Sequence, residues 1–422
     1  MDRGTWGRSP SRHHHPPPEL LVRVPTIAPA PNANVTAAPV VIVGGGFGGL
    51  YTALALANRK GHPPILLIEP QAHFLFLPLL FELLSGEVRR WEIAPRYDTL
   101  LAGKGVAWLQ DRVSTIDCQT RTVHTQTGRA LTYSRLVVAT GARSQSFGIP
   151  GVDAHTIGFR SLQDVERLQQ RIAQLKRRDR PLQRLAVVGA GATGVELACK
   201  LADCLAGAAL VELVEQGSTL LPAAKAFNRE QAKQALQRKD VRLRCNTQVM
   251  AVTADHLELQ GPQGREQLAV DGVIWTAGLR FEAPPMVPLP QTDNRGRLRC
   301  DADLHLLSQP EVFALGDIAQ IDGSDPLPIT AQVAFQEAEC LATNLMHSLA
   351  GEAQESFQFK DLGEMISLGI GEAAITGGGF TLAGPAAFQV RRLAYLARLP
   401  GKTQQLKAAA GWLGSAALAW QS

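Results

Sequence analysis

Two glycine clusters contain the residues whose types and spacing point most directly to chemistry. Both have the spacing GxGxxG, and their glycines are Gly44, Gly46 and Gly49 in the first and Gly189, Gly191 and Gly194 in the second. In such a motif the first glycine makes a tight turn, the second admits a pyrophosphate and the third lets a helix pack closely on a strand. Backbone N–H groups at the start of that helix then face the phosphates. Two complete motifs predict two bound dinucleotides, since electron transfer needs a donor and an acceptor.

An acid follows each glycine motif at the distance expected of a ribose ligand. Glu69 lies 25 positions after Gly44, and Glu215 lies 26 positions after Gly189. A carboxylate there accepts hydrogen bonds from ribose hydroxyls, and at Glu215 it favours NADH over the 2′-phosphate of NADPH. The alternative for Glu215 is an ordinary acid at the end of a strand.

The elements around the two motifs follow one pattern: a short apolar strand, a glycine turn, a helix and a second apolar strand that ends in the acid. The repeats cover 40–69 and 185–215. Strand, helix and strand in this order make a parallel βαβ unit. The predicted fold class is therefore α/β, with two tandem Rossmann-like dinucleotide-binding domains.

Further buried strands are predicted at 136–141, 272–278 and 312–317, and the last of these returns to the first half of the chain. Asp317 ends that strand, where its carboxylate is expected to bind the ribityl chain of FAD or, alternatively, to cap a helix. The predicted parts are a disordered leader at 1–38, an FAD-binding domain at 39–155 and 285–355, an NAD(P)H-binding domain at 156–284 and a C-terminal region at 356–422.

Composition excludes several classes of protein. The 422 residues are 45% hydrophobic, enough for two or three cores. A net charge of +4 with dispersed basic residues argues against nucleic acid as a partner. Six cysteines without a CxxC pair predict neither a zinc site nor a redox dithiol, so no metal is expected. No segment has the pattern of a transmembrane helix.

Together these motifs resemble the pyridine nucleotide-disulfide oxidoreductase superfamily over about residues 38–355. The stretch 331–338 contains AQxAxQ and resembles an element of the type II, or alternative, NAD(P)H:quinone oxidoreductases, and 74–80 resembles the FxFxPLL stretch of that family. The likeness extends to the tail and is strongest to the cyanobacterial and plastid branch, some members of which act on demethylphylloquinone or plastoquinone.

The resemblance implies that NADH or NADPH passes a hydride to FAD, which then passes two electrons to a membrane quinone without proton pumping. It places Ala331 and Gln332 at the flavin and Gln336 on the quinone path, where a neutral amide can hydrogen-bond a carbonyl without burying a charge. Glu196 matches an acid close to the nicotinamide that positions the ring or relays protons. A purely structural helix acid is an equal alternative. The remaining residues that the resemblance assigns to the cofactors are Thr140, Gly141 and Gly316 for FAD and Gly278 for NAD(P)H.

The tail from 373 to 422 contains basic residues but no Asp or Glu. Its periodicity predicts two short amphipathic helices, the first with a basic face of Arg391, Tyr395 and Arg398. The apolar stripe of the second helix consists of Leu406, Ala410, Leu413, Ala417 and Trp420. We expect this region to lie on anionic lipid, which makes the chain a peripheral protein on the cytoplasmic side of a thylakoid or plasma membrane. Packing within the domain or in a dimer is the alternative, and the resemblance alone suggests a homodimer.

Other functions for the same fold are separated by cysteine placement and by chemistry. A disulfide reductase is excluded because no cysteine lies between 47 and 81. A sulfide:quinone reductase needs cysteines near the flavin, and the six cysteines here do not fall at the expected places. A soluble FAD reductase and a non-enzymatic NAD(P)H redox sensor are the remaining alternatives.

Overall fold

The computed structural model describes residues 38–178, 180, 182–323 and 326–419, so the predicted leader, apart from Ala38, lies outside the described residues. The largest sheet has eight strands. In spatial order they are β22 (Ala319–Ile321), β19 (Leu298–Cys300), β20 (His305–Leu306), β21 (Gln309–Ala314), β7 (Arg135–Val138), β1 (Val40–Val43), β2 (Ile65–Ile68) and β3 (Val106–Leu109). This sheet thus combines segments from both sides of the second glycine motif. The exact domain boundaries stay a prediction.

The second sheet has five strands and lies between those two segments in the sequence. In spatial order its strands are β12 (Arg242–Arg244), β11 (Leu210–Val214), β10 (Arg184–Val188), β16 (Val273–Trp275) and β9 (Thr156–Ile157). All of its pairings are parallel. A two-stranded antiparallel ribbon of β8 (Arg143–Ser144) and β17 (Leu279–Arg280) joins the two runs of chain that enter and leave this sheet.

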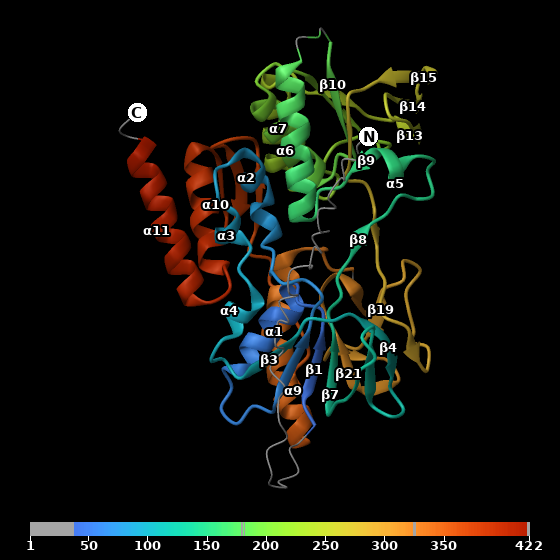
Figure 1. Cartoon of the computed structure of the whole chain (residues 1–422), viewed down its shortest axis with the longest axis vertical. Helices are drawn as coiled ribbons and strands as arrows, with labels where there is room; N and C mark the ends of the chain where they lie inside the picture. Colours follow the sequence, from blue (N-terminus) through green and yellow to red (C-terminus); the bar gives the residue numbers. More distant parts are fainter. Residues whose placement is uncertain (1–37, 179, 181, 324–325, 420–422) are drawn as a thin grey trace, which may run out of the picture. The chain divides into compact units, whose positions relative to one another are not determined.

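The predicted repeat is confirmed as two parallel βαβ units. In the first unit, β1 pairs with β2 on one side and β7 on the other, and α1 (Phe47–Ala57) connects β1 to β2. In the second unit, β10 pairs with β11 and β16, and α7 (Ala192–Leu205) connects β10 to β11. Strand β1 is buried along its whole length, as its continuous β-branched run predicts. Figure 1 shows the two units in different parts of the chain.

Helix α9 (Ala331–Ala350) begins at the AQxAxQ element, as predicted. Thr330 is its N-cap, and the Thr330 hydroxyl accepts a hydrogen bond from the Val333 N–H at 3.3 Å. The helix packs against α1 and against the 3₁₀ turn η2 (Gly316–Ile318) that follows β21 (Figure 1). The late strand and this helix therefore both return to the first glycine motif.

The remaining small sheets are antiparallel hairpins. One consists of β13 (Gln248–Val252), β14 (His256–Gly261) and β15 (Gly264–Ala269), and another of β4 (Val113–Asp117), β5 (Thr122–Thr125) and β6 (Ala130–Thr132), joined in parallel by β18 (Met286–Val287). The third consists of β23 (Glu364–Ser367), β24 (Ala373–Gly377) and β25 (Phe380–Gly384) and opens the C-terminal region.

Two helices end the described chain, as the periodicity predicts: α10 (Pro385–Arg398) and α11 (Lys402–Ala419). The predicted basic face of α10 is wrong, however. The Arg391 side chain is 1% exposed and pairs with Glu82 of α2 (Leu80–Ser85), so this face packs inward. A buried carboxylate needs a cationic partner, and α10 supplies it. Helix α11 packs on α10 and on α3 (Arg90–Ile93) (Figure 1).

Among the described side chains, the outward face of these helices combines exposed apolar residues with exposed lysines, Lys402 and Lys407. Leu393 is 63% exposed and Leu406 is 72% exposed. The side chains of Leu413 and Ala417, and the whole of Trp420, lie outside the described residues. Among the described helices, none combines the length and the apolarity needed to cross a bilayer.

Candidate active site

The glycines of the first motif make a turn that other residues could not adopt. Gly44 has φ of +101°, and a Cβ added to it would lie 2.5 Å from the Ala139 carbonyl oxygen. A Cβ on Gly49 would lie 1.8 Å from the Gly44 carbonyl oxygen. A Cβ on Gly46 would meet nothing within 4 Å, and no side chain caps α1. The N-terminus of α1 therefore faces open space at Gly46 without a side-chain cap among the described residues, which fits a pyrophosphate.

Glu69 is fixed at the end of β2 by backbone donors. Its two carboxylate oxygens accept hydrogen bonds from the Gly45 N–H and the Gln71 N–H, each at 2.8 Å. The Tyr97 hydroxyl donates to the Gly45 carbonyl oxygen at 2.7 Å and so braces the same turn. Sequence reasoning missed Tyr97, because nothing near it in the sequence marks its contact with the motif.

The other residues predicted to bind FAD follow the neighbouring strands β7 and β21. They are Thr140 and Gly141 after β7, and Gly316 and Asp317 after β21. Since β2, β1, β7 and β21 are adjacent and parallel, their carboxyl ends bring these residues to one edge of the sheet. Burial raises the pKa of Asp317, and only the positive charge of Arg160 opposes this. A half-buried carboxylate at this edge suits the hydroxyl donors of a ribityl chain.

The second motif reproduces the geometry of the first. Gly189 also has φ of +101°, and a Cβ on Gly194 would again lie 1.8 Å from the carbonyl oxygen of the first glycine. The oxygens of Glu215 accept from the Ala190 N–H and the Gly217 N–H, each at 2.7 Å. A Cβ on Gly191 would meet nothing within 4 Å. A second dinucleotide therefore fits this turn by the same criteria.

Gly278 follows β16, the strand beside β10, and so lies at the same edge as the second motif. It has φ of +75°, and a Cβ added to it would lie 2.3 Å from the ring of Phe147. Phe147 is 55% exposed, which leaves an aromatic ring at this edge that sequence reasoning missed. Gly278 is therefore required both by its backbone conformation and by the ring that lies against it.

Gln332 and Gln336 share one face of α9, as their spacing of four predicts. Both amides bind the backbone of residues 360–363. The Gln332 amide donates to the Gly363 carbonyl oxygen at 3.2 Å and accepts from the Leu362 N–H at 2.9 Å. The Gln336 amide donates to the Lys360 carbonyl oxygen at 2.9 Å and accepts from the Lys360 N–H at 3.0 Å. The roles of Ala331 and Gln332 at a flavin and of Gln336 on a quinone path stay predictions.

Glu196 does not lie with the glycines of its own motif but two residues beyond them, facing α10 and the C-terminal hairpin. Its carboxylate accepts from the Ser367 N–H at 2.7 Å and lies 3.5 Å from the Arg391 guanidinium. Burial raises the pKa of Glu196 to about 7, against the opposing charge of Arg391. Near neutral pH this carboxyl can therefore both hold and release a proton.

Most partners of Glu196 could not be predicted from the sequence. Glu82 interrupts an apolar run, and this lone acid is the one sequence feature that could have indicated a buried charge pair there. One of its oxygens, Oε2, is buried without a hydrogen-bond partner among the described residues.

All six cysteines are free thiols, and no group of His, Cys, Asp and Glu among the described residues could hold a metal ion.

Comparison with known proteins places this geometry in a family. The family model described as pyridine nucleotide-disulphide oxidoreductase matches residues 38–338. A demethylphylloquinone reductase of Synechocystis sp. is 38% identical over 387 residues, which cover 89% of this chain and 95% of that protein. The chloroplastic/mitochondrial alternative NAD(P)H-ubiquinone oxidoreductase C1 of Arabidopsis thaliana is 35% identical over 423 residues, covering 90% of this chain and 81% of that protein.

The fold also matches a solved structure. The structure of NDH2 from Plasmodium falciparum in complex with NADH has a TM-score of 0.80 at 19% identity, covering 89% of this chain and 97% of that one. The chain is therefore an enzyme of the pyridine nucleotide-disulphide oxidoreductase family and, within it, belongs to the type II NAD(P)H:quinone oxidoreductases.

Proposed function

We propose that this enzyme holds FAD on the first βαβ unit, oxidises NADH bound on the second, and reduces a membrane quinone of the plastoquinone or demethylphylloquinone type without pumping protons. The observation that supports this best is the repeated glycine and acid geometry, with φ of +101° at both Gly44 and Gly189 and open space beyond both turns. Two dinucleotides of different redox role fit such a pair of sites.

The residues of the chain contribute binding, orientation and proton handling. Gly46 and Gly191 leave room for the pyrophosphates, while Glu69 and Glu215 accept hydrogen bonds from ribose hydroxyls. FAD, when bound, supplies the chemistry of accepting a hydride and returning two electrons to the quinone. Glu196 holds a proton at its carboxyl near neutral pH, beside the Arg391 guanidinium.

Kinetics with purified holoenzyme test this function. We expect FAD-dependent oxidation of NADH that requires a quinone, with higher kcat/KM for NADH than for NADPH and higher turnover with naphthoquinone or plastoquinone analogues than with ferredoxin. Tightly bound FAD without quinone-dependent NADH oxidation would instead support a redox sensor. A sulfide-dependent and NADH-independent quinone reduction would support a sulfide:quinone reductase.

We propose that the outward faces of α10 and α11 contact the membrane, in place of the basic face predicted from the sequence. The exposed side chains Leu393 and Leu406 would enter the lipid boundary, and the exposed Lys402 and Lys407 would meet anionic headgroups. A position on the cytoplasmic side of a thylakoid or plasma membrane is part of the same proposal.

A double variant, Leu393→Glu with Leu406→Glu, tests the membrane contact. We expect the fraction bound to anionic phospholipid vesicles to fall at least about tenfold, since each exposed leucine contributes roughly 1.5–3 kcal/mol on burial. Leu243→Glu on β12 is the matched control, because Leu243 is 38% exposed and far from the tail in sequence. Unchanged binding by the double variant would disprove the contact, and activity on a water-soluble quinone should be retained in both variants.

A further inference from the structure

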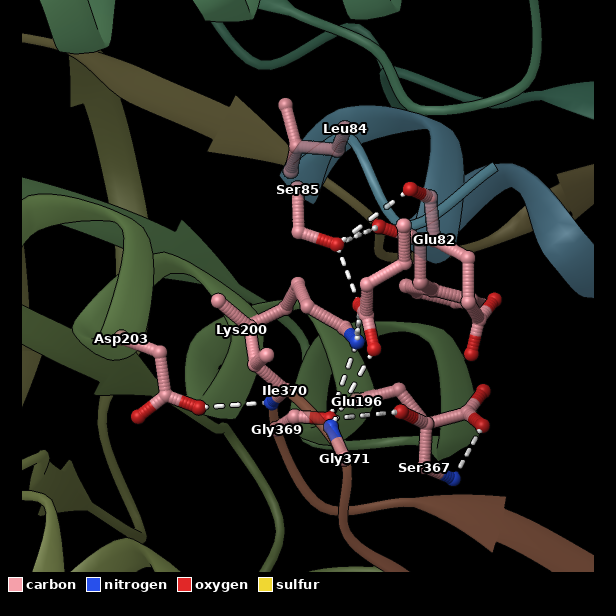
Figure 2. A network of polar contacts seen from close by, with 12 residues as sticks. Glu82, Leu84, Ser85, Glu196, Lys200, Asp203, Ser367, Gly369, Ile370 and Gly371 are labelled. Atoms are coloured by element: carbon pink, nitrogen blue, oxygen red, sulfur yellow. Dashed lines mark hydrogen bonds and ion pairs between the residues drawn. The ribbon is translucent and has the colours of Figure 1, made fainter. Parts of the chain in front are cut away.

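Beyond the glycine motif, three side chains on successive turns of α7 bind a turn of the C-terminal hairpin. The turn consists of residues 367–371 and joins β23 to β24. The side chains at i, i+4 and i+7 each bind one backbone group of it. The contacts are Glu196 from the Ser367 N–H at 2.7 Å, Lys200 to the Gly369 carbonyl oxygen at 2.9 Å and Asp203 from the Ile370 N–H at 2.7 Å. Figure 2 shows these three acceptor and donor groups along one side of the helix.

Lys200 is the central member of this set and is fully buried. Its ammonium also pairs with Glu87, which follows α2 and lies in the run of chain between the first motif and β3. The second carboxylate oxygen of Glu87 accepts from the Gly371 N–H at 3.1 Å. One buried ammonium therefore joins α7, the segment after α2 and the 367–371 turn. A buried lysine is tolerated only with such partners, because an unpaired one costs several kcal/mol.

The 367–371 turn packs closely against α7 at Gly369. Gly369 has φ of +127°, and a Cβ on it would lie 2.3 Å from Asp203 Oδ2 and 2.6 Å from Lys239 Nζ. Lys239 itself pairs with Asp203 at 2.7 Å. The backbone that donates to Glu196 is thus fixed through Lys200 and Asp203, four and seven residues further along the same helix.

We propose that Lys200 is a positioning residue for Glu196: its buried ammonium holds the 367–371 turn on α7 and so keeps the Ser367 N–H against the Glu196 carboxylate. The inference rests on the proposed function, because it takes Glu196 to serve the reaction. The Lys200 ammonium binds Glu87 and the Gly369 carbonyl oxygen, so its effect on the Glu196 carboxylate passes through the turn and through its charge.

The electrostatic surroundings of Glu196 agree with this role. Burial raises the pKa of Glu196, while the positive charges of Arg391 and Lys200 lower it. The groups that face Glu196 are Arg391 and Tyr395 of α10, Glu82 of α2, and Cys199 and Lys200 of α7. Of the two cations, Lys200 is the one that also fixes the backbone donor to Glu196.

The test compares Lys200→Met with Lys225→Met in the FAD-loaded enzyme. Lys225 forms an exposed ion pair with Asp361 at 2.7 Å, so it joins the segment after the second unit to the C-terminal region and serves as the matched control. In Lys200→Met we expect hydrogen exchange of the Ile370 and Gly371 amides to accelerate at least about tenfold, because two anchors of the turn are lost. Lys225→Met should leave this exchange unchanged.

The second readout is the pH profile of quinone-dependent turnover. The midpoint that belongs to Glu196 is identified as the one that disappears in Glu196→Gln. In Lys200→Met it should move to higher pH by about half a pH unit or more, since a nearby positive charge favours the ionised carboxylate. Lys200→Arg, which keeps the charge, should restore much of the wild-type value.

The possible failures are distinguishable. If Glu196→Gln keeps the midpoint, the proposed role of Glu196 is wrong, and the inference that depends on it is wrong as well. If Glu196→Gln removes the midpoint but Lys200→Met does not move it, the inference alone is overturned. This holds even if the Ile370 and Gly371 amides exchange faster in Lys200→Met. Should Lys200→Met not fold, Lys200→Gln removes the charge and keeps a polar side chain. Unchanged exchange at Ile370 and Gly371 in that variant also overturns the inference.

Discussion

The two βαβ units have the same turn geometry but differ at the position two residues after the third glycine. That position is Tyr51 in α1 and Glu196 in α7. Both contact the same C-terminal helix: the Tyr51 hydroxyl donates to the Arg398 carbonyl oxygen, and Glu196 lies 3.5 Å from the Arg391 guanidinium. The glycines and the acid therefore define the nucleotide turn, and the residue just beyond them defines how each unit meets α10.

The surroundings of these two residues differ in polarity. Tyr51 stacks on Phe47, and its ring lies 4.6 Å from that of Phe335. Burial raises the pKa of its hydroxyl, which therefore stays neutral and donates. Glu196 instead lies among charged groups and titrates near neutral pH. The first unit is thus joined to α10 by a neutral hydrogen bond from an aromatic environment, and the second by charge.

The largest expected effects come from Gly49→Ala and Gly194→Ala, which separate the two units by cofactor. In each variant the new Cβ would lie 1.8 Å from a backbone carbonyl oxygen, so the turn must open. We expect Gly49→Ala to be purified without flavin absorbance, and Gly194→Ala to retain flavin but bind NADH at least about 100-fold more weakly. Loss of flavin in Gly194→Ala would show that the units do not act separately.

The next effect tests the charged contact between the second unit and α10. Arg391→Met leaves Glu82 and Glu196 buried without their cation and should lower the free energy of unfolding by about 3–5 kcal/mol, measured by urea denaturation. Arg398→Met is the control from the contact between the first unit and α10, because the Tyr51 hydrogen bond goes to the Arg398 backbone. The loss of stability in this variant should stay below about 1 kcal/mol. Equal losses of unfolding free energy in the two variants would show that the two contacts with α10 do not differ in this way.

A smaller, pH-dependent effect is expected from Glu337 of α9, the buried acid beside the first unit. Its carboxylate accepts from the Gly316 N–H at 2.6 Å, and burial raises its pKa to about 7. Between its ordinary value of 4.5 and about 7 the native state keeps this proton while the unfolded state loses it, so stability falls as pH rises through this window.

Glu337→Gln should therefore gain stability relative to wild type between pH 5 and pH 8, on the order of 1–3 kcal/mol. Thermal unfolding across this pH range measures the difference. A constant difference between the two proteins from pH 5 to pH 8 would mean that Glu337 is not protonated in the native state near neutral pH.

The smallest effect compares the two ribose acids. Glu215→Gln removes the charge that repels a 2′-phosphate and should shift the NADPH to NADH ratio of kcat/KM by roughly tenfold toward NADPH. Glu69→Gln should leave this ratio unchanged and weaken FAD retention instead. An unchanged ratio in Glu215→Gln would favour the alternative in which Glu215 is only a strand-end acid.

The glycine turns, the two acids and the start of α9 could be predicted because each depends on local backbone constraints. A GxGxxG turn needs its glycines for steric reasons, and Glu69 and Glu215 follow their strands directly. Thr330 and the AQxAxQ element likewise mark a helix start within a few residues. Such rules need no knowledge of what lies across the fold.

The partners of the tail could not be predicted in this way. Periodicity places Arg391 and Tyr395 on one face of α10, but it does not say whether that face meets lipid or protein. The answer depends on Glu82, 309 residues earlier in the chain. Lys200 was missed for the same reason, because its two partners, Glu87 and Gly369, lie 113 and 169 residues away.

The two glutamines of α9 have a thermodynamic consequence for any ligand that would use them. Each amide already donates to and accepts from the backbone of residues 360–363, so a ligand can bind it only after that backbone has been released. Ligand binding at Gln332 or Gln336 and release of this segment are then one linked equilibrium. The segment acts as an intramolecular competitor at high effective concentration. A substitution that weakens its binding to Gln332 and Gln336 should therefore increase the affinity for the ligand by the same factor.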